Sequence, residues 1–139
     1  MTVLLDTGLI YAFLNREDAN HREAKDLVHR IGRRAFGAPF VTDHVVDELF
    51  TLVRARTRSP QLEAAARRFL PLPDPQVHGL VPLSLGGAAL RKAWEVFDRY
   101  RDQRISFTDA TLIVTLKELH MDMLATFDDR LRKLVPCAT

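Results

Sequence analysis

The sequence lacks a second cysteine, a long apolar run and a signal-peptide pattern. Cys137 is the only cysteine, so no intrachain disulfide can form and a reducing compartment is expected. No run approaches the ~18 apolar residues of a membrane-spanning helix. The apolar residues 3–5 are followed at once by the acidic Asp6, unlike the apolar core of a signal peptide. We therefore expect a soluble, cytoplasmic protein with no membrane partner.

Repeats, low-complexity segments and long linkers are absent as well. The proline-rich stretch PLPDPQVHG, residues 71–79, is too short to join two domains. A chain of 139 residues, 47% of them hydrophobic, has the size of one domain, and such a domain buries roughly two-thirds of its unfolded surface. We predict a single domain over residues 1–139.

The net charge is only +2, yet the 20 basic residues are mostly arginine and gather in short clusters. Such clusters commonly form solvated helix faces. The planar guanidinium also matches phosphate oxygens, which would suit a nucleic-acid partner. Both interpretations stay open for the following residues: Arg30, Arg33 and Arg34; Arg54, Arg56 and Arg58; Arg67 and Arg68; Arg99, Arg101 and Arg104.

Four short, continuously apolar runs have the pattern of buried parallel strands. Apolar residues between these runs recur at helical spacing, and Trp94 and Phe97 fall on one such helix, where we expect them in the core. Alternating strands and helices predict an α/β domain with a short parallel sheet covered by helices on both faces. The predicted strands are residues 3–5, 40–42, 80–83 and 123–126.

The triplet Asp6-Thr7-Gly8 also occurs at the catalytic turn of aspartic proteases. Those enzymes need an almost entirely β fold and a second aspartate from a paired lobe or subunit. Here Gly8 is followed directly by the helical pattern LIYAFL. The sequence therefore argues against a protease.

Four acidic residues are predicted at the carboxyl ends of the strands, where open parallel sheets bind ligands. Asp6 and Asp128 directly follow the first and last predicted strands. Glu48 lies in the second turn of the helix after the second strand. Asp109 lies in the first turn of the helix that begins at ISFTDA. Each has a simpler interpretation. Asp6 and Asp128 could be helix N-caps, Ser106 and Asp109 have capping-box spacing, and Glu48 could face solvent.

Four carboxylates in one place would repel one another, since two charges ~4 Å apart cost about 4 kcal/mol at an effective dielectric of ~20. A bound cation would remove this repulsion. Thr7, Thr108 and Thr126 add hydroxyl oxygens beside the acids, and the five histidines show no zinc-binding spacing. Hard oxygen ligands favour Mg²⁺ or Mn²⁺. Such a cation can activate water for attack on a phosphodiester.

The blocks LLDTGLIYAFL, VVDELFTL, SFTDATLI and LATFDDRL occur in the order typical of the PIN-domain family. Over residues 6–134 the sequence resembles the VapC-type toxins of prokaryotic toxin–antitoxin pairs. The resemblance implies a Rossmann-like α/β/α sandwich, divalent-metal-dependent ribonuclease activity on RNA, and a small antitoxin protein as partner. A homodimer is also expected, because the chain is small for an RNA enzyme. The catalytic and metal-binding acids implied by the resemblance are Asp6, Glu48, Asp109 and Asp128.

Two of these acids have an acidic neighbour. Helical geometry places Glu48 slightly nearer the apolar stripe than Asp47, and the resemblance favours Glu48. Asp128 fits the family's TFD, whereas Asp129 suits the first turn of the last helix. We predict Asp129, Thr7, Thr108 and Thr126 as supporting residues.

Two other protein classes with aspartates at strand ends fit the sequence less well. A receiver-like signalling domain needs an adjacent acid pair at the first strand and a late lysine, and a haloacid-dehalogenase-like phosphatase needs a second aspartate where Gly8 stands. The stronger alternatives are a housekeeping RNA-processing PIN nuclease and a non-catalytic module for RNA binding or dimerisation.

Overall fold

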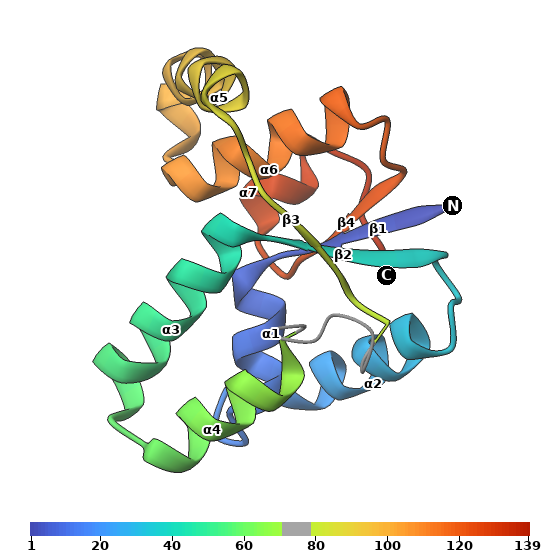
Figure 1. The fold of residues 1–139 in the computed structure, drawn as a ribbon, viewed down its shortest axis with the longest axis vertical. Helices are drawn as coiled ribbons and strands as arrows, with labels where there is room; N and C mark the ends of the chain where they lie inside the picture. Colours follow the sequence, from blue (N-terminus) through green and yellow to red (C-terminus); the bar gives the residue numbers. More distant parts are fainter. Residues whose placement is uncertain (71–78) are drawn as a thin grey trace.

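The computed structural model describes residues 1–70 and 79–139, and within them the strands form one parallel sheet (Figure 1). The order across the sheet is β3-β2-β1-β4, and each neighbouring pair is parallel. This confirms the predicted α/β class and parallel sheet. The strands are β1 (Thr2–Leu5), β2 (Ala38–Thr42), β3 (Val81–Leu83) and β4 (Met123–Ala125).

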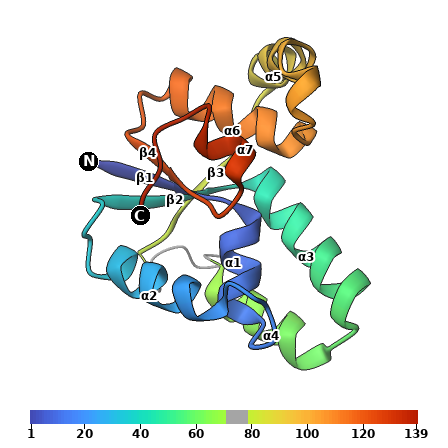
Figure 2. The same ribbon diagram turned by 180° about the vertical axis from the view of Figure 1, so that it is seen from behind.

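Helices cover both faces of this sheet, as predicted. In Figures 1 and 2, α5, α6 and α7 lie above the sheet, and α1, α2 and α4 lie below it. In the part of the chain that the structure describes, no helix is long and apolar enough to cross a membrane. The helices are α1 (Thr7–Leu14), α2 (His21–Gly32), α3 (Asp43–Thr57), α4 (Pro60–Phe69), α5 (Gly87–Arg99), α6 (Phe107–Glu118) and α7 (Asp129–Arg132), with a 3-10 turn at Arg101–Gln103.

Local sequence signals explain where several helices begin. The Thr42 hydroxyl accepts the Val45 N–H at 3.2 Å and caps α3. Ser59 caps α4 in the same way, and Pro60 occupies the first turn, where its missing N–H costs nothing. These caps fix the chain direction directly after β2 and before α4.

The register of the central strands brings their carboxyl ends to one edge. Leu4 of β1 pairs with Phe40 of β2 and with Leu124 of β4. Leu4 and Leu124 are fully buried, and burial of such a side chain contributes about 1.5–3 kcal/mol. Parallel pairing at this register places the residues that follow β1, β2 and β4 together, which is where the site forms.

The expectation that Trp94 and Phe97 belong to the core is wrong. Trp94 is 65% exposed and Phe97 39% exposed, and each packs edge-on against the ring of Phe107. Helix α5 lies outermost and packs on α6, so it buries a narrow stripe that includes Ala93 and Val96. Aromatic residues beside that stripe remain at the surface.

Four strand boundaries differ by one or two residues from those expected, since β1 already begins at Thr2 and β2 at Ala38. Leu80 precedes β3, and Thr126 follows β4. Thr126 therefore lies just beyond the last paired residue of β4, and its hydroxyl donates to Asp6. The predicted proline-rich loop falls on residues 71–79, almost all of which lie outside the described part of the chain.

Candidate active site

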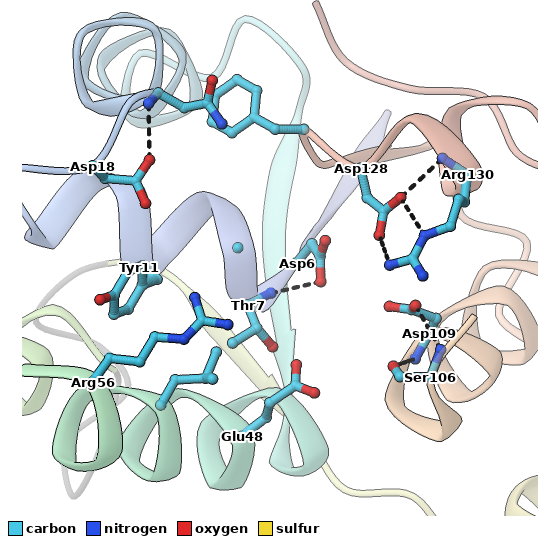
Figure 3. A pocket seen from close by; sticks show the side chains of 14 residues that line it. Asp6, Thr7, Tyr11, Asp18, Glu48, Arg56, Ser106, Asp109, Asp128 and Arg130 are labelled. Carbon is cyan, nitrogen blue, oxygen red and sulfur yellow. Dashed lines mark hydrogen bonds and ion pairs between the residues drawn. The ribbon is translucent and has the colours of Figure 1, made fainter. Parts of the chain in front are cut away.

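The four predicted acids line one pocket of about 500 Å³ at the carboxyl edge of the sheet (Figure 3). Asp6 lies between β1 and α1, Glu48 is on α3, Asp109 is on α6, and Asp128 follows β4. The structure therefore brings together side chains that are up to 122 residues apart, from Asp6 to Asp128. Their grouping follows from the parallel sheet.

Asp6 is the most enclosed of the four, at 6% exposed. Its carboxylate caps α1 by accepting the Thr7 N–H at 2.7 Å, and it accepts the Thr126 hydroxyl at 2.6 Å. Burial raises the pKa of Asp6 from 3.8 to about 7. The Thr126 and Thr7 hydrogen bonds oppose this rise, and the charges of Asp109 and Glu48 add to it. Asp6 is thus a helix cap and also a buried acid of the pocket with a raised pKa.

Asp109 likewise has both roles. The Ser106 side chain accepts the Asp109 N–H at 3.0 Å, and Asp109 Oδ2 accepts the Ser106 N–H at 2.9 Å, which completes the predicted capping box. Burial raises the pKa of Asp109, and the charges of Asp128 and Glu48 act in the same direction. Capping uses Oδ2 of the carboxylate, and the side chain still lines the pocket.

Asp128 is held by Arg130. Its Oδ1 accepts the Arg130 backbone N–H at 2.8 Å and Nε at 3.0 Å, and its Oδ2 accepts Nη2 at 2.7 Å. These hydrogen bonds lower the pKa of Asp128, against the effect of its partial burial. Arg130 itself lines the pocket. Sequence reasoning missed Arg130 as a site residue, although its position two residues after a helix cap was a usable signal.

The acids with an adjacent acidic residue differ from that neighbour in burial and in contact with the pocket. Glu48 is half-buried and lines the pocket, whereas Asp47 is exposed and does not. Asp129 begins α7, as expected, and its side chain is 89% exposed. Thr7 lines the pocket and Thr126 bonds Asp6, but Thr108 and Asp129 are not part of the pocket wall.

The donor chemistry of the pocket fits a hard divalent cation. Carboxylates from different elements face one cavity, and Thr7 Oγ1 is buried with no hydrogen-bond partner among the described residues. Within residues 1–70 and 79–139, no three Asp, Glu, His or Cys side chains are placed to hold one ion together. Asp6, Asp109 and Asp128 each accept hydrogen bonds from neighbouring donors instead.

Other basic and aromatic groups complete the rim. Arg56 lies over the ring of Tyr11, with its guanidinium carbon 5.6 Å from the ring centre, and both residues line the pocket. Among the clustered arginines of the sequence, Arg56 is therefore one that the fold places beside the acids.

Comparison with known proteins agrees with this architecture. The family model of the PIN domain matches residues 3–135. The chain is 29% identical to a VapC ribonuclease of Archaeoglobus fulgidus over 137 residues, which cover 94% of this chain and 79% of that protein.

Two solved structures share the fold. VapC20 of Mycobacterium tuberculosis, described as a Sarcin-Ricin loop cleaving toxin, has a TM-score of 0.77 at 22% identity, over 94% of this chain and 93% of that one. FitAcB from Neisseria gonorrhoeae has a TM-score of 0.61 at 18% identity, over 98% and 96%. Since the family model spans nearly the whole sequence and the fold agrees, this chain belongs to the PIN domain family.

Proposed function

We propose that this protein is a divalent-metal-dependent endoribonuclease that hydrolyses RNA phosphodiester bonds, and that it is the toxin of a VapBC-type toxin–antitoxin pair. The convergence of Asp6, Glu48, Asp109 and Asp128 in one pocket carries the proposal. The similarity to the VapC ribonuclease supports RNA as substrate and an antitoxin as partner.

In this mechanism Asp6 and Asp109, the two most buried acids, would hold Mg²⁺ or Mn²⁺. The bound cation would stabilise charge on the phosphodiester and lower the pKa of a water molecule. Thr126 and the Thr7 N–H fix the Asp6 carboxylate, and Glu48 would orient the attacking water. Asp128 is predicted as a further ligand by the resemblance, although both its oxygens accept hydrogen bonds from Arg130.

A matched pair of substitutions on α3 tests the site. We expect Glu48→Gln to slow cleavage of a single-stranded RNA by about 10²–10⁴-fold, since it removes the group that orients water. Asp47→Asn should cut like wild type, because Asp47 is exposed outside the pocket. The measurement is the initial rate on fluorescent RNA in Mn²⁺, with EDTA as the metal-free control.

Three results would contradict the proposal in different ways. Equal rates for both variants would exclude Glu48 from the chemistry. Cleavage that persists in EDTA would exclude the metal. RNA binding without cleavage under any divalent cation would favour the non-catalytic module.

A growth experiment separates a toxin from a housekeeping nuclease. We expect expression of the wild-type chain alone to arrest a bacterial host, and Asp6→Asn to grow normally, because toxicity would require cleavage of cellular RNA. Co-expression of the small protein encoded beside the gene should restore growth. Equal growth of both strains would argue against the toxin. The homodimer stays a prediction, checked by the mass of the protein in solution.

A further inference from the structure

Arg130 occupies an unusual position for a surface arginine. Its side chain lines the acidic pocket and is 48% exposed, so a ligand can reach it. In Figure 3 the guanidinium lies beside the carboxylates of Asp128 and Asp109. The site thus contains its own fixed positive charge.

The guanidinium is held from two sides. Nε and Nη2 donate to the two oxygens of Asp128, and Nη1 donates to the Arg104 carbonyl at 2.6 Å. Arg104 directly precedes the segment that leads into α6, so this contact connects α7 to the α6 side of the pocket. A guanidinium has five N–H groups, and these contacts use three of them. The other two have no partner among residues 1–70 and 79–139 and can donate to a ligand.

Capping alone does not require this arrangement. Asp128 caps α7 by accepting the Arg130 backbone N–H, and that bond involves no arginine side chain. The side chain nevertheless folds back to engage both carboxylate oxygens. The donors to Asp6 and Asp109 are neutral hydroxyl and backbone groups, whereas Asp128 is paired with the charged guanidinium of Arg130, which would repel a cation bound at Asp128.

We propose that Arg130 binds a phosphate of the substrate RNA in this pocket and that Asp128 positions Arg130 instead of ligating the metal. The inference rests on the proposed ribonuclease function. A planar fork held in place loses little freedom when it binds a phosphate, and it offsets the field of the acids that would otherwise repel the RNA backbone. This role for Asp128 leaves Asp6 and Asp109 as the ligands of the cation, with Glu48 beside them.

RNA affinity without metal tests the phosphate contact. Fluorescence anisotropy with a single-stranded RNA oligonucleotide in EDTA reports binding with no cleavage. We expect Arg130→Gln to weaken binding about fivefold to tenfold and to lower the salt slope by about one, as loss of one phosphate contact does. Arg130→Lys should be intermediate, because it keeps charge but loses the fork.

Arg132→Gln is the matched control. Arg132 carries the same charge on the same helix, but it pairs with Asp129 and does not line the acidic pocket. It should bind RNA like wild type. Equal affinities for Arg130→Gln and Arg132→Gln, with matching melting temperatures, would overturn the phosphate contact.

Metal affinity tests the role given to Asp128. By calorimetry with Mn²⁺ and no RNA, Asp128→Asn should bind within about threefold of wild type, while Asp6→Asn should lose about tenfold or more. A loss in Asp128→Asn as large as that in Asp6→Asn would show that Asp128 is a ligand and overturn its role as a positioning residue.

The two proposals fail in different ways. If RNA binds through Arg130 but Mn²⁺ supports no cleavage, the nuclease is wrong and the phosphate contact stands. If Mn²⁺ supports cleavage and Arg130→Gln binds RNA like wild type, the contact is wrong and the nuclease stands.

Discussion

Replacement of Asp6 by asparagine is expected to slow RNA cleavage by at least about 10²–10³-fold, the loss that follows removal of one preorganised electrostatic group. The fold should be as stable as wild type or more stable. Asp6 is buried, faces the charges of Asp109 and Glu48, and has a pKa of about 7. Asparagine removes that charge while keeping a side-chain oxygen for the Thr7 N–H. Rates and melting temperatures measured on the same preparations give both results.

Asp6→Ala is the control for this prediction. Alanine cannot cap α1, so it should lose activity and also cost about 0.5–2 kcal/mol of stability relative to asparagine. Asp109→Asn should behave like Asp6→Asn, since Asp109 is also buried with a raised pKa. An active Asp6→Asn would mean that Asp6 is only a structural cap, and an Asp6→Asn that unfolds well below wild type would contradict the predicted relief of charge repulsion.

The stability of the metal-free protein is expected to fall as pH rises from about 4 to about 7. The unfolded chain releases the Asp6 proton near 3.8, whereas the folded chain holds it to about 7. Protonation therefore favours the folded state in this window, and the advantage is lost as pH passes the folded value. A shift of this size corresponds to about 4 kcal/mol.

Comparison with Asp6→Asn isolates this effect, because other acids titrate too. Asp109 has a raised pKa and acts in the same direction, while Asp128 has a lowered pKa and acts oppositely. In urea unfolding with EDTA, the free energy of unfolding of Asp6→Asn relative to wild type should increase by about 4 kcal/mol between about pH 4 and about pH 8. A constant difference across this range would contradict the raised pKa.

Mn²⁺ should reduce that difference in stability above neutral pH. A cation that binds only the folded state adds about 2.7 kcal/mol at a hundred times its Kd, and it replaces the proton as the partner of Asp6. The gain should be small in Asp6→Asn. Equal stabilisation of both proteins would place the Mn²⁺ elsewhere on the surface.

The sequence by itself determined the strand and helix order, the caps and the grouping of the acids. Apolar runs followed by Asp6 and by Thr126-Phe127-Asp128 marked two strand ends, and Ser106 with Asp109 marked the start of α6. Carboxyl ends of parallel strands must meet at one edge, so the local pattern was enough to predict that acids far apart in the chain share a pocket. Thr108 and Asp129 were placed too near the site, because adjacency in sequence does not fix the direction of a side chain.

Only the tertiary structure decided the burial, the long-range hydrogen bonds and the pKa shifts of those acids. The Thr126 hydroxyl reaches Asp6 across 120 residues, and Arg130 reaches the Arg104 carbonyl across 26. Neither contact has a local periodicity that could predict it. Local periodicity likewise does not predict the exposure of Trp94, because that exposure depends on how much of α5 the neighbouring segments cover. Periodicity fixes which side chains share a face, but burial and long-range hydrogen-bond donors come from segments that meet only after folding, and they set the pKa of Asp6 and hold Arg130 against Arg104.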